Sequence, residues 1–287
     1  MTLLQLIQAQ SARLTQAGVS FGHGTGNAFD EAAWLVQWAL RLPLDALADQ
    51  AERPVTAAEA AKAEALVARR IATRQPAAYL TREAWLQGVP FYVDERAIVP
   101  RSFIAELIAD GSIDPWLSDR TRRVLDLCTG NGSLAVLAAM AWPEVEVDAA
   151  DLSDDALAVA RINVDRHGLP PRIRLLRSDG LAALPGPYDL ILCNPPYVNA
   201  TAMAELPAEY RAEPALALAG GIDGMDFIRT LLRDVPSRMT PEAVLVLEIG
   251  HEREHFERAF PRLEVVWMDT SAGGDQVLLI PRESLQP

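Results

Sequence analysis

A glycine-containing turn between an apolar run and a helical pattern constrains the fold of this chain more than any other feature. Residues 123–128 are largely apolar, the turn Thr129-Gly130-Asn131-Gly132 follows, and residues 134–140 have a helical pattern. Glycines in such a turn let the chain reverse tightly and let a ligand lie against bare backbone. The pattern is typical of the first strand, turn and helix of a doubly wound α/β sheet.

An acidic residue at the end of the next apolar run strengthens this prediction. Residues 145–150 form that run, and Asp151 follows it, 21 positions after Gly130. An acidic side chain about 20 residues past the glycines fits the ribose hydroxyls of a nucleotide-like ligand. The glycine pair alone is weak evidence, but the pair together with Asp151 indicates a nucleotide-type site.

The tetrapeptide Asn194-Pro195-Pro196-Tyr197 suggests a chemistry for that site. It directly follows another apolar run, residues 188–193. Two prolines remove two backbone N–H donors, which leaves a carboxamide, carbonyl oxygens and an aromatic ring. Such a loop accepts hydrogen bonds from an –NH2 group, which suits methyl transfer to a planar amine or amide nitrogen. The alternative is a proline-rich strand exit that only turns the chain.

Length and cysteine content predict a two-domain protein of a reducing compartment. A chain of 287 residues buries roughly 75% of its unfolded surface and divides naturally into two domains. It has no apolar run of the ~20 residues that a membrane helix needs. The first residues lack a basic segment and resemble an amphipathic helix more than a signal peptide. With two cysteines, Cys128 and Cys193, we expect small buried hydrophobes in a cytoplasmic protein, not disulfides.

The net charge of −13 is concentrated in one part of the chain. Residues 1–98 carry 10 acidic and 9 basic side chains, whereas residues 99–287 carry 29 and 17. Proteins that grip nucleic acid usually show a basic footprint, which the acidic part lacks. We therefore expect no direct nucleic-acid binding and a field that attracts a basic protein. An ordinary acidic excess on a soluble surface remains the alternative.

Periodicity predicts helices first and alternating strands and helices afterwards. Helices are expected at residues 3–17, 30–40 and 56–73, the last with Thr56 and Glu59 as a capping box. Residues 82–98 predict a hairpin. The glycine-rich residues 21–27 follow no strand, so they are expected to be an inter-helix loop. Strands are expected near residues 124–128, 145–150, 172–177, 188–193, 243–249, 263–268 and 276–281, the last two as an antiparallel pair at the sheet edge.

One motif is a decoy. Residues 251–255, His-Glu-Arg-Glu-His, match the metalloprotease pattern in which two histidines on one helix face bind zinc. Only His23 and His167 remain as histidines for a third ligand, and charged residues fill the motif. An exposed helix face is the better interpretation, and no metal is expected.

These motifs together resemble the class I S-adenosylmethionine-dependent protein-(glutamine-N5) methyltransferases, which act on release factors or ribosomal proteins. Within this family the chain is most similar to the PrmB-type branch, which acts on large ribosomal subunit protein three and is related to the HemK/PrmC release-factor methyltransferases. The resemblance covers nearly the whole chain. It rests on residues 22–25, 91–101, 126–130, 194–198 and 206–218. Arg82, Phe103 and Asn131 depart from the family pattern.

The resemblance implies the architecture. We expect an α/β protein whose Rossmann-like, seven-stranded class I methyltransferase domain spans residues 99–287. A small helical substrate-recognition domain, residues 1–80, and a linking β-hairpin, residues 81–98, precede it.

The resemblance also implies the site residues. S-adenosylmethionine is the expected cofactor and S-adenosylhomocysteine the product. The residues expected to bind this cofactor are Asp126, Cys128, Thr129, Gly130, Asn131, Gly132, Asp151, Asp179, Gly180 and Asn194. The residues expected in catalysis are Asn194, Pro195 and Tyr197; those expected to bind substrate are the same three with Pro196 and Arg101. Arg101 is equally well explained as a salt-bridge partner.

The chemistry of an amide suggests how this loop works. An amide nitrogen is a poor nucleophile because its lone pair is delocalised into the carbonyl. Asn194 Oδ1 and the Pro195 carbonyl would each accept one hydrogen of the –NH2 group and hold the nitrogen in line with the methyl donor. Tyr197 would pack against the amide plane and exclude water.

Three alternatives remain open at this point. A release factor could replace the ribosomal protein as substrate. A DNA or RNA base methyltransferase uses similar chemistry, but base flipping needs a basic strand-binding surface. A catalytically inactive binding module is the third possibility, although the intact motifs argue against it.

Overall fold

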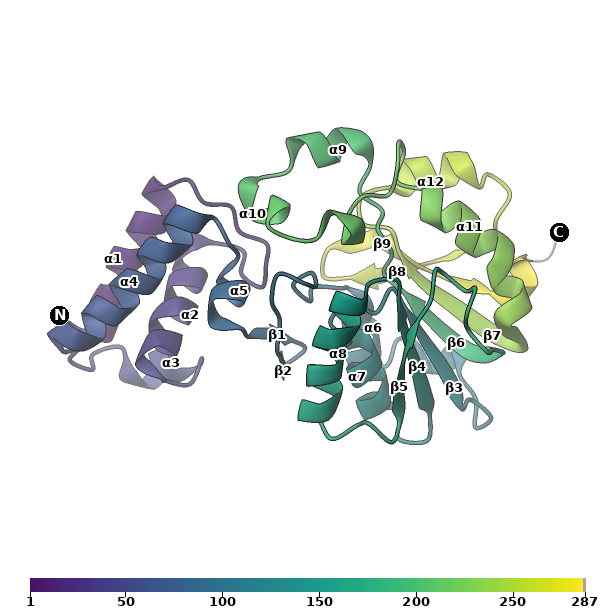
Figure 1. Cartoon of the computed structure of the whole chain (residues 1–287), viewed down its shortest axis with the longest axis horizontal. Helices are drawn as coiled ribbons and strands as arrows, with labels where there is room; N and C mark the ends of the chain where they lie inside the picture. The colour runs from purple at the N-terminus through teal and green to yellow at the C-terminus, as the bar shows by residue number, and fades with distance from the viewer. Residues whose placement is uncertain (286–287) are drawn as a thin grey trace.

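The structure, a computed structural model, describes residues 1–285 and consists of a helical bundle beside a large α/β sheet (Figure 1). The bundle lies at the amino-terminal end of the chain, and a short two-stranded hairpin lies between it and the sheet (Figure 1). Its helices are α1 (Leu3–Gln16), α2 (Ala28–Leu40), α3 (Ala46–Gln50), α4 (Ala57–Thr73) and α5 (Ala77–Thr81).

Side-chain caps explain where the long bundle helices begin. Thr2 and Gln5 form a capping box on α1, and Asn27 caps α2 by accepting from two backbone N–H groups. The predicted capping box of Thr56 and Glu59 is confirmed on α4. The sequence pattern did not predict α3 and α5, which have only five residues each and therefore little periodicity. Residues 21–27 lie between α1 and α2, as expected.

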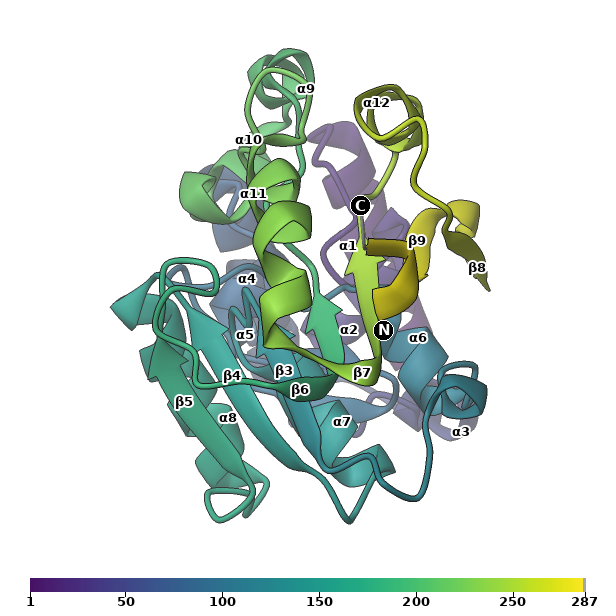
Figure 2. The same cartoon turned by 90° about the vertical axis from the view of Figure 1, so that its right-hand side faces the viewer.

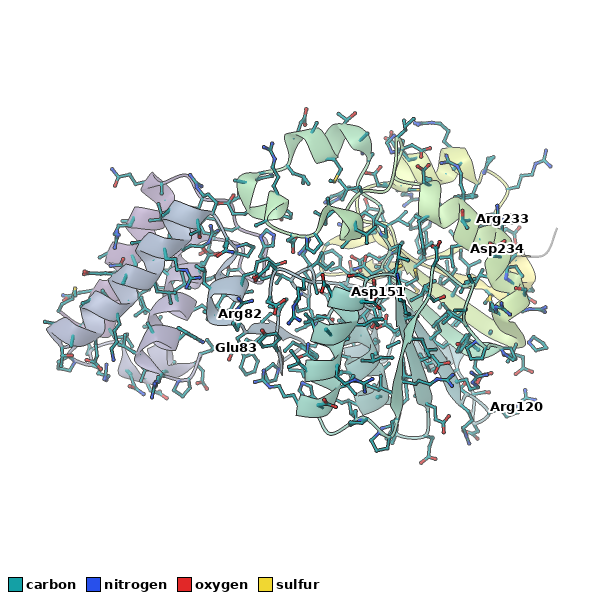
Figure 3. All side chains as sticks on the ribbon, in the orientation of Figure 1. Arg82, Glu83, Arg120, Asp151, Arg233 and Asp234 are labelled. Carbon is teal, nitrogen blue, oxygen red and sulfur yellow. The ribbon has the colours of Figure 1, made fainter. Side chains whose placement is uncertain are left out.

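The predicted hairpin is present and short. Strands β1 (Ala84–Leu86) and β2 (Val89–Phe91) pair antiparallel around Gln87 and Gly88. Both turn residues have positive φ, 49° and 73°, as a two-residue hairpin turn of the I′ type requires. Arg82 and Glu83 mark the start of the hairpin, between the helical bundle and the sheet (Figure 3).

A seven-stranded sheet forms within residues 1–285, in the order β5-β4-β3-β6-β7-β9-β8. All pairs are parallel except those that involve β9, so the predicted antiparallel pair at the edge is confirmed. The strand order reverses at β3, whose neighbours are β4 and β6. Their bounds are β3 (Arg123–Leu127), β4 (Glu146–Asp151), β5 (Ile173–Arg177), β6 (Tyr188–Cys193), β7 (Met239–Glu248), β8 (Val266–Thr270) and β9 (Gly273–Pro281).

Helices cover both faces of this sheet (Figure 2). One face packs against α6 (Ile104–Ala109), α7 (Ser133–Ala141) and α8 (Asp154–Arg166). The other packs against α11 (Asp226–Asp234) and α12 (Arg253–Ala259). Ligands of such sheets bind outside the carboxyl ends of the strands at the point of reversal, which here lies between β3 and its two neighbours. Short 3₁₀ turns complete the chain at η1 (Asp114–Trp116), η2 (Ala215–Ala217), η3 (Val235–Arg238) and η4 (Arg282–Leu285).

An insertion between β6 and β7 reaches back to the helical bundle. It contains α9 (Ala200–Glu205) and α10 (Ala208–Arg211). The buried Arg70 of α4 donates to Glu31 at 2.9 Å and to Glu209 of α10 at 3.2 Å, and Arg74 also reaches Glu209. Buried ion pairs therefore fix the insertion against the bundle. In the described part of the chain, no helix is both long and apolar enough to cross a membrane.

Candidate active site

A buried carboxylate at the end of β3 supports the glycine turn through hydrogen bonds. Asp126 Oδ2 accepts the Thr129 hydroxyl and the Ala135 backbone N–H, the latter at 3.0 Å. Its Oδ1 has no hydrogen-bond partner within residues 1–285. Burial raises the pKa of Asp126 to about 7, although these two donors oppose the rise. Asp126 thus fixes the loop that follows β3.

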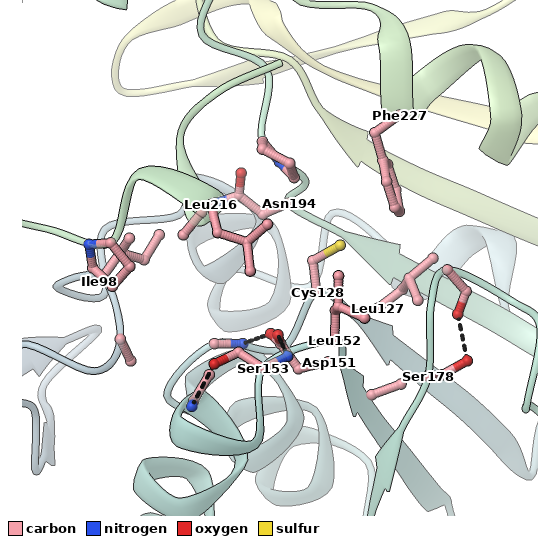
Figure 4. Close-up of a pocket in the computed structure, with 18 of the residues that line it drawn as sticks. Ile98, Leu127, Cys128, Asp151, Leu152, Ser153, Ser178, Asn194, Leu216 and Phe227 are labelled. Atoms are coloured by element: carbon pink, nitrogen blue, oxygen red, sulfur yellow. Dashed lines mark hydrogen bonds between the residues drawn. The ribbon is translucent and has the colours of Figure 1, made fainter. Parts of the chain in front are cut away.

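Asp151 lies across the same loop, at the end of β4. Its Oδ2 accepts the Gly130 N–H and its Oδ1 accepts the Ser153 N–H, both at 2.9 Å (Figure 4). Burial raises the pKa of Asp151, and the backbone N–H donors partly offset that effect. Each carboxylate oxygen has two acceptor sites, so Asp151 retains capacity for ligand hydroxyls.

A narrow cleft opens above Asp151 and holds six of the residues that the sequence singled out for the cofactor. In Figure 4 Asp151 lies on one side of this cleft and Asn194 and Phe227 lie on the other. Its volume is about 140 Å³. The six residues are Cys128, Gly130, Asp151, Asp179, Gly180 and Asn194.

The other four residues that the sequence singled out for the cofactor support the glycine turn and do not line the cleft. Asp126 and Thr129 bond to each other beneath it. A Cβ on Gly132 would stand 3.1 Å from the Ala160 Cβ, so Gly132 serves the close packing of α7 on α8. Asn131 is buried, and its carbonyl accepts from Asn163.

Several lining residues of the cleft were not anticipated from the sequence. Ile98, Leu216 and Phe227 come from three segments outside the strand ends, and Leu152 and Ser178 directly follow β4 and β5. Cys128, expected to be a buried hydrophobe, is only partly buried and has a left-handed φ of 61°. The hydrogen bond with Cys193, and then burial, raise the pKa of its thiol, which keeps that thiol neutral. Cys193 is fully buried.

Asn194 stands in the wall between this cleft and a second, larger cavity. The second cavity has a volume of about 880 Å³ and is also lined by Pro195, Tyr197 and Arg101. Asn194, Ile98 and Ala217 line both spaces. Among the hydrogen bonds of residues 1–285, none engages the Asn194 carboxamide or the Pro195 carbonyl. The Asn194 carboxamide is therefore free where the two spaces meet, and the neighbouring Pro195, whose carbonyl is also free, lines the large cavity.

Tyr197 is held in place from two sides. Its hydroxyl donates to Glu248 Oε1 at 3.3 Å, and a Cβ on Gly250 would come within 2.5 Å of its ring. Glu248 is buried and also accepts from the Ser102 hydroxyl and the Phe103 N–H. Burial raises the pKa of Glu248. Pro196 lines the narrow cleft.

Arg101 forms an ion pair, the second of the two roles considered for it. Its guanidinium makes two 2.7 Å bonds to the carboxylate of Glu213, which also accepts the Val99 N–H at 2.9 Å. His23 of the α1–α2 loop lies 3.4 Å from the same carboxylate. The guanidinium centre lies 5.5 Å from the centroid of the Tyr210 ring. Arg101 still lines the second cavity.

The histidine motif adopts a different arrangement from the exposed helix face that was expected. Helix α12 begins only at Arg253, so His251 precedes it and lines the second cavity. His255 Nδ1 contacts the carboxylate of Glu252, which is buried and also accepts from Asn199 at 2.7 Å. Over residues 1–285, no group of three metal-ligating side chains is assembled.

Comparison with known sequences gives matches along almost the entire chain. The family model described as "PrmC N-terminal domain" matches residues 5–81, and that described as "Methyltransferase small domain" matches residues 113–210. A protein of Bordetella pertussis named "Ribosomal protein uL3 glutamine methyltransferase" is 52% identical over 99% of this chain and 96% of its own length. One of Burkholderia pseudomallei with the same name is 51% identical over 99% and 95%.

Comparison with solved structures supports the fold. The hMettl16 catalytic domain, solved in complex with the MAT2A 3′UTR hairpin 6, superposes with a TM-score of 0.52. The match covers 78% of this chain and 81% of the other, at 14% sequence identity. At this level of identity the likeness concerns the fold alone.

Proposed function

The chain belongs to the family of ribosomal protein uL3 glutamine methyltransferases, and on that premise we propose that it methylates the side-chain amide nitrogen, N5, of a glutamine in uL3. The proposed methyl donor is S-adenosylmethionine. Its sulfonium group supplies an electrophilic methyl group when it is bound.

The observation that carries this proposal is the position of Asn194 between the two spaces. Its carboxamide is free at the boundary of the narrow cleft and the large cavity, and Pro195, whose carbonyl is also free, lines the large cavity next to it. A glutamine –NH2 group that enters from the large cavity would donate one hydrogen to each. The two acceptors orient the amide nitrogen and stabilise the positive charge that develops on it during transfer.

Tyr197 and its neighbours fit a role in closing this site. The hydrogen bond to Glu248 and the contact with Gly250 limit the movement of the Tyr197 ring. A ring held in this way excludes water from the amide and strengthens the hydrogen bonds at the nitrogen. Pro195 and Pro196 add no competing N–H donors.

The side chains of the narrow cleft support this choice of donor. Asp151 offers carboxylate acceptors for ribose hydroxyls, while Leu152 and Phe227 offer apolar surface beside Asp179 and Gly180 for an adenine ring. The neutral Cys128 thiol adds no charge that would compete for the sulfonium group. We propose that Asp126, Thr129, Asn131 and Gly132 act through the loop, because none of them lines the cleft.

We propose that the cleft widens when the donor binds. Small-molecule sites generally have volumes of about 300–1,000 Å³, and this cleft has about 140 Å³. Leu216, on the insertion, lines the cleft and is 58% exposed. Displacement of this exposed side chain would open the cleft with little loss of packing.

We propose that residues 1–80 recognise the substrate and that residues 99–287 carry out the methyl transfer. Residues 81–98 connect these two parts. Glycines of the α1–α2 loop line the large cavity together with the Asn194 loop, which supports a shared substrate site. The acidic charge of the transferase region favours a basic protein over nucleic acid as the partner.

Transfer of a labelled methyl group to purified uL3, release factors and ribosomal RNA, measured side by side, tests this proposal. We expect uL3 to be labelled at least tenfold faster than the other acceptors. Preferential labelling of a release factor would move the substrate assignment to the release-factor branch. Preferential labelling of RNA would overturn the amide mechanism.

A further inference from the structure

A second groove, on the helical bundle, lies outside the site described so far. Its volume is about 340 Å³, and its walls come from α2, the segment that leads into α3, and strand β1. Three of its large apolar side chains are well exposed: Phe29 and Leu44 at 38% and Trp85 at 41%. We call this feature the aromatic groove. It is lined by Gly24, Thr25, Phe29, Asp30, Ala33, Trp34, Gln37, Leu44, Leu47 and Trp85.

The polar groups of the aromatic groove differ in whether they have hydrogen-bond partners. Gln37 is fully engaged, since it donates to the carbonyls of Ala33 and Leu44 and accepts the Leu47 N–H. Trp34 is only 8% exposed, and its Nε1–H has no acceptor in the described chain. A buried indole N–H usually has a partner. The groove therefore has apolar walls and one unused hydrogen-bond donor, a combination that suits an apolar side chain next to a backbone carbonyl.

The aromatic groove adjoins the large cavity. Gly24 and Thr25 of the α1–α2 loop line both spaces. An extended peptide that leaves the large cavity over these small residues reaches the groove within a few residues, because each residue spans about 3.3 Å. Asp30 on the groove wall adds negative charge on that route, which favours a basic protein.

We propose that the aromatic groove is a second docking point for the protein substrate and takes an apolar side chain of the same uL3 molecule whose glutamine enters the large cavity. This inference rests on the proposed function. The Trp34 Nε1 atom is covered in this structure, so side chains of the groove must shift before the backbone carbonyl of the docked segment reaches it. Docking thus combines apolar burial with one new hydrogen bond.

Trp85 is the residue best suited to test the aromatic groove. It lies on β1, and its Nε1–H donates to the adjacent Glu83 at 2.8 Å, which orients the ring. Tryptophan is one of the residue types enriched among the side chains that contribute most to binding at protein interfaces. The second variant is Leu44→Ser. Trp116→Ala is the matched control, because Trp116 is 36% exposed and does not line the groove.

The experiment compares KM for whole uL3 with KM for a synthetic peptide that contains only the methylated glutamine and its neighbours. Trp85→Ala should raise KM for uL3 roughly 10- to 30-fold, since truncation of an interface hot spot typically has an effect of this order. Leu44→Ser should also raise KM for uL3. The KM of the peptide and the kcat of both substrates should stay unchanged, as should all values for Trp116→Ala.

Each result of this comparison has a distinct meaning. Equal KM values for uL3 with wild type and both groove variants would overturn the second docking point while leaving the proposed function intact. Absence of uL3 methylation by wild type would instead overturn the proposed function. Self-association of wild type that is lost in Trp85→Ala, seen by light scattering, would assign the groove to a second copy of this chain and overturn the inference.

Discussion

The buried carboxylate of Glu213 allows a quantitative test of how the active-site region is held together. Its side chain is fully buried and accepts from both Arg101 Nη atoms at 2.7 Å and from the Val99 N–H at 2.9 Å. It lies on the insertion, whereas Arg101 follows the hairpin and the nearby His23 belongs to the bundle. One carboxylate therefore connects three segments. We consider the variant Glu213→Gln.

The magnitude follows from the pKa of this group. Burial is the largest single effect and raises the pKa of Glu213, but the Arg101 guanidinium and His23 together outweigh it and lower this pKa from 4.5 to about 2. One pKa unit corresponds to about 1.4 kcal/mol, so ionisation stabilises the fold by roughly 3 kcal/mol at pH 7. Removal of one partner of a buried pair typically costs about 3–5 kcal/mol, because the other charge is left uncompensated. We expect Glu213→Gln to lower the free energy of unfolding by that amount.

The dependence on pH has a definite sign. A carboxyl whose pKa is lowered by folding stabilises the protein fully above the pKa of the unfolded chain, and this contribution is lost as the pH falls from 4.5 through 2. At pH 3 the remaining contribution is roughly 1.4 kcal/mol. The difference between wild type and Glu213→Gln should therefore narrow by about 2 kcal/mol between pH 7 and pH 3.

Urea unfolding followed by circular dichroism at pH 7 and pH 3 measures these differences. Glu257→Gln is a matched control, because Glu257 forms an exposed pair with Arg253 four positions earlier in the chain. Pairs of that kind contribute less than about 0.5 kcal/mol. If Glu213→Gln destabilises the protein no more than Glu257→Gln does, the buried pair does not hold the three segments together and the reasoning is refuted.

The remaining predictions concern the site itself. Asn194→Ala should lower kcat by about 10²–10³ with little effect on binding of the methyl donor, because the lost acceptor acts as charge develops on the nitrogen. Single-turnover kinetics measure the rate and calorimetry measures donor binding; a wild-type rate would remove Asn194 from the mechanism. Asp151→Ala should weaken donor binding by about 1.5–3 kcal/mol; unchanged affinity in a folded variant would remove the ribose assignment. Higher salt should slow association with a basic protein substrate, since electrostatic attraction between the two proteins is screened over ~8–10 Å. A stopped-flow association rate that does not change with ionic strength would contradict a steering role for the acidic surface.

The sequence was sufficient to predict the sheet and the residues at its strand ends. Asp151 and Asn194 each directly follow an apolar run, and the carboxyl ends of adjacent parallel strands meet at one edge. Their convergence therefore follows from local patterns. The antiparallel edge pair was predictable for the same reason, because a short glycine-containing loop separates its two strands.

The residues that sequence reasoning missed depend on contacts between distant segments. Glu213 pairs with Arg101 across 112 positions, and no local pattern specifies which acid an arginine will meet. Leu216 and Phe227 reach the cleft from the insertion and α11, whose positions depend on tertiary packing. The left-handed conformation of Cys128 is also unexpected for a non-glycine residue, and the turn imposes it. Glu252 is buried despite its charged neighbours in the sequence, and its carboxylate has partners in Asn199 and His255.

The most direct test of the central claim is the chemical position of the transferred methyl group. Purified uL3 is incubated with isotopically labelled S-adenosylmethionine and the wild-type protein, and tandem mass spectrometry then identifies the labelled atom group. A parallel reaction contains the Asn194→Ala variant in place of the wild-type protein. The proposed mechanism predicts the label on the side-chain amide nitrogen of a glutamine and its near absence with Asn194→Ala. A label on another side chain, or equal labelling by both proteins, would contradict it.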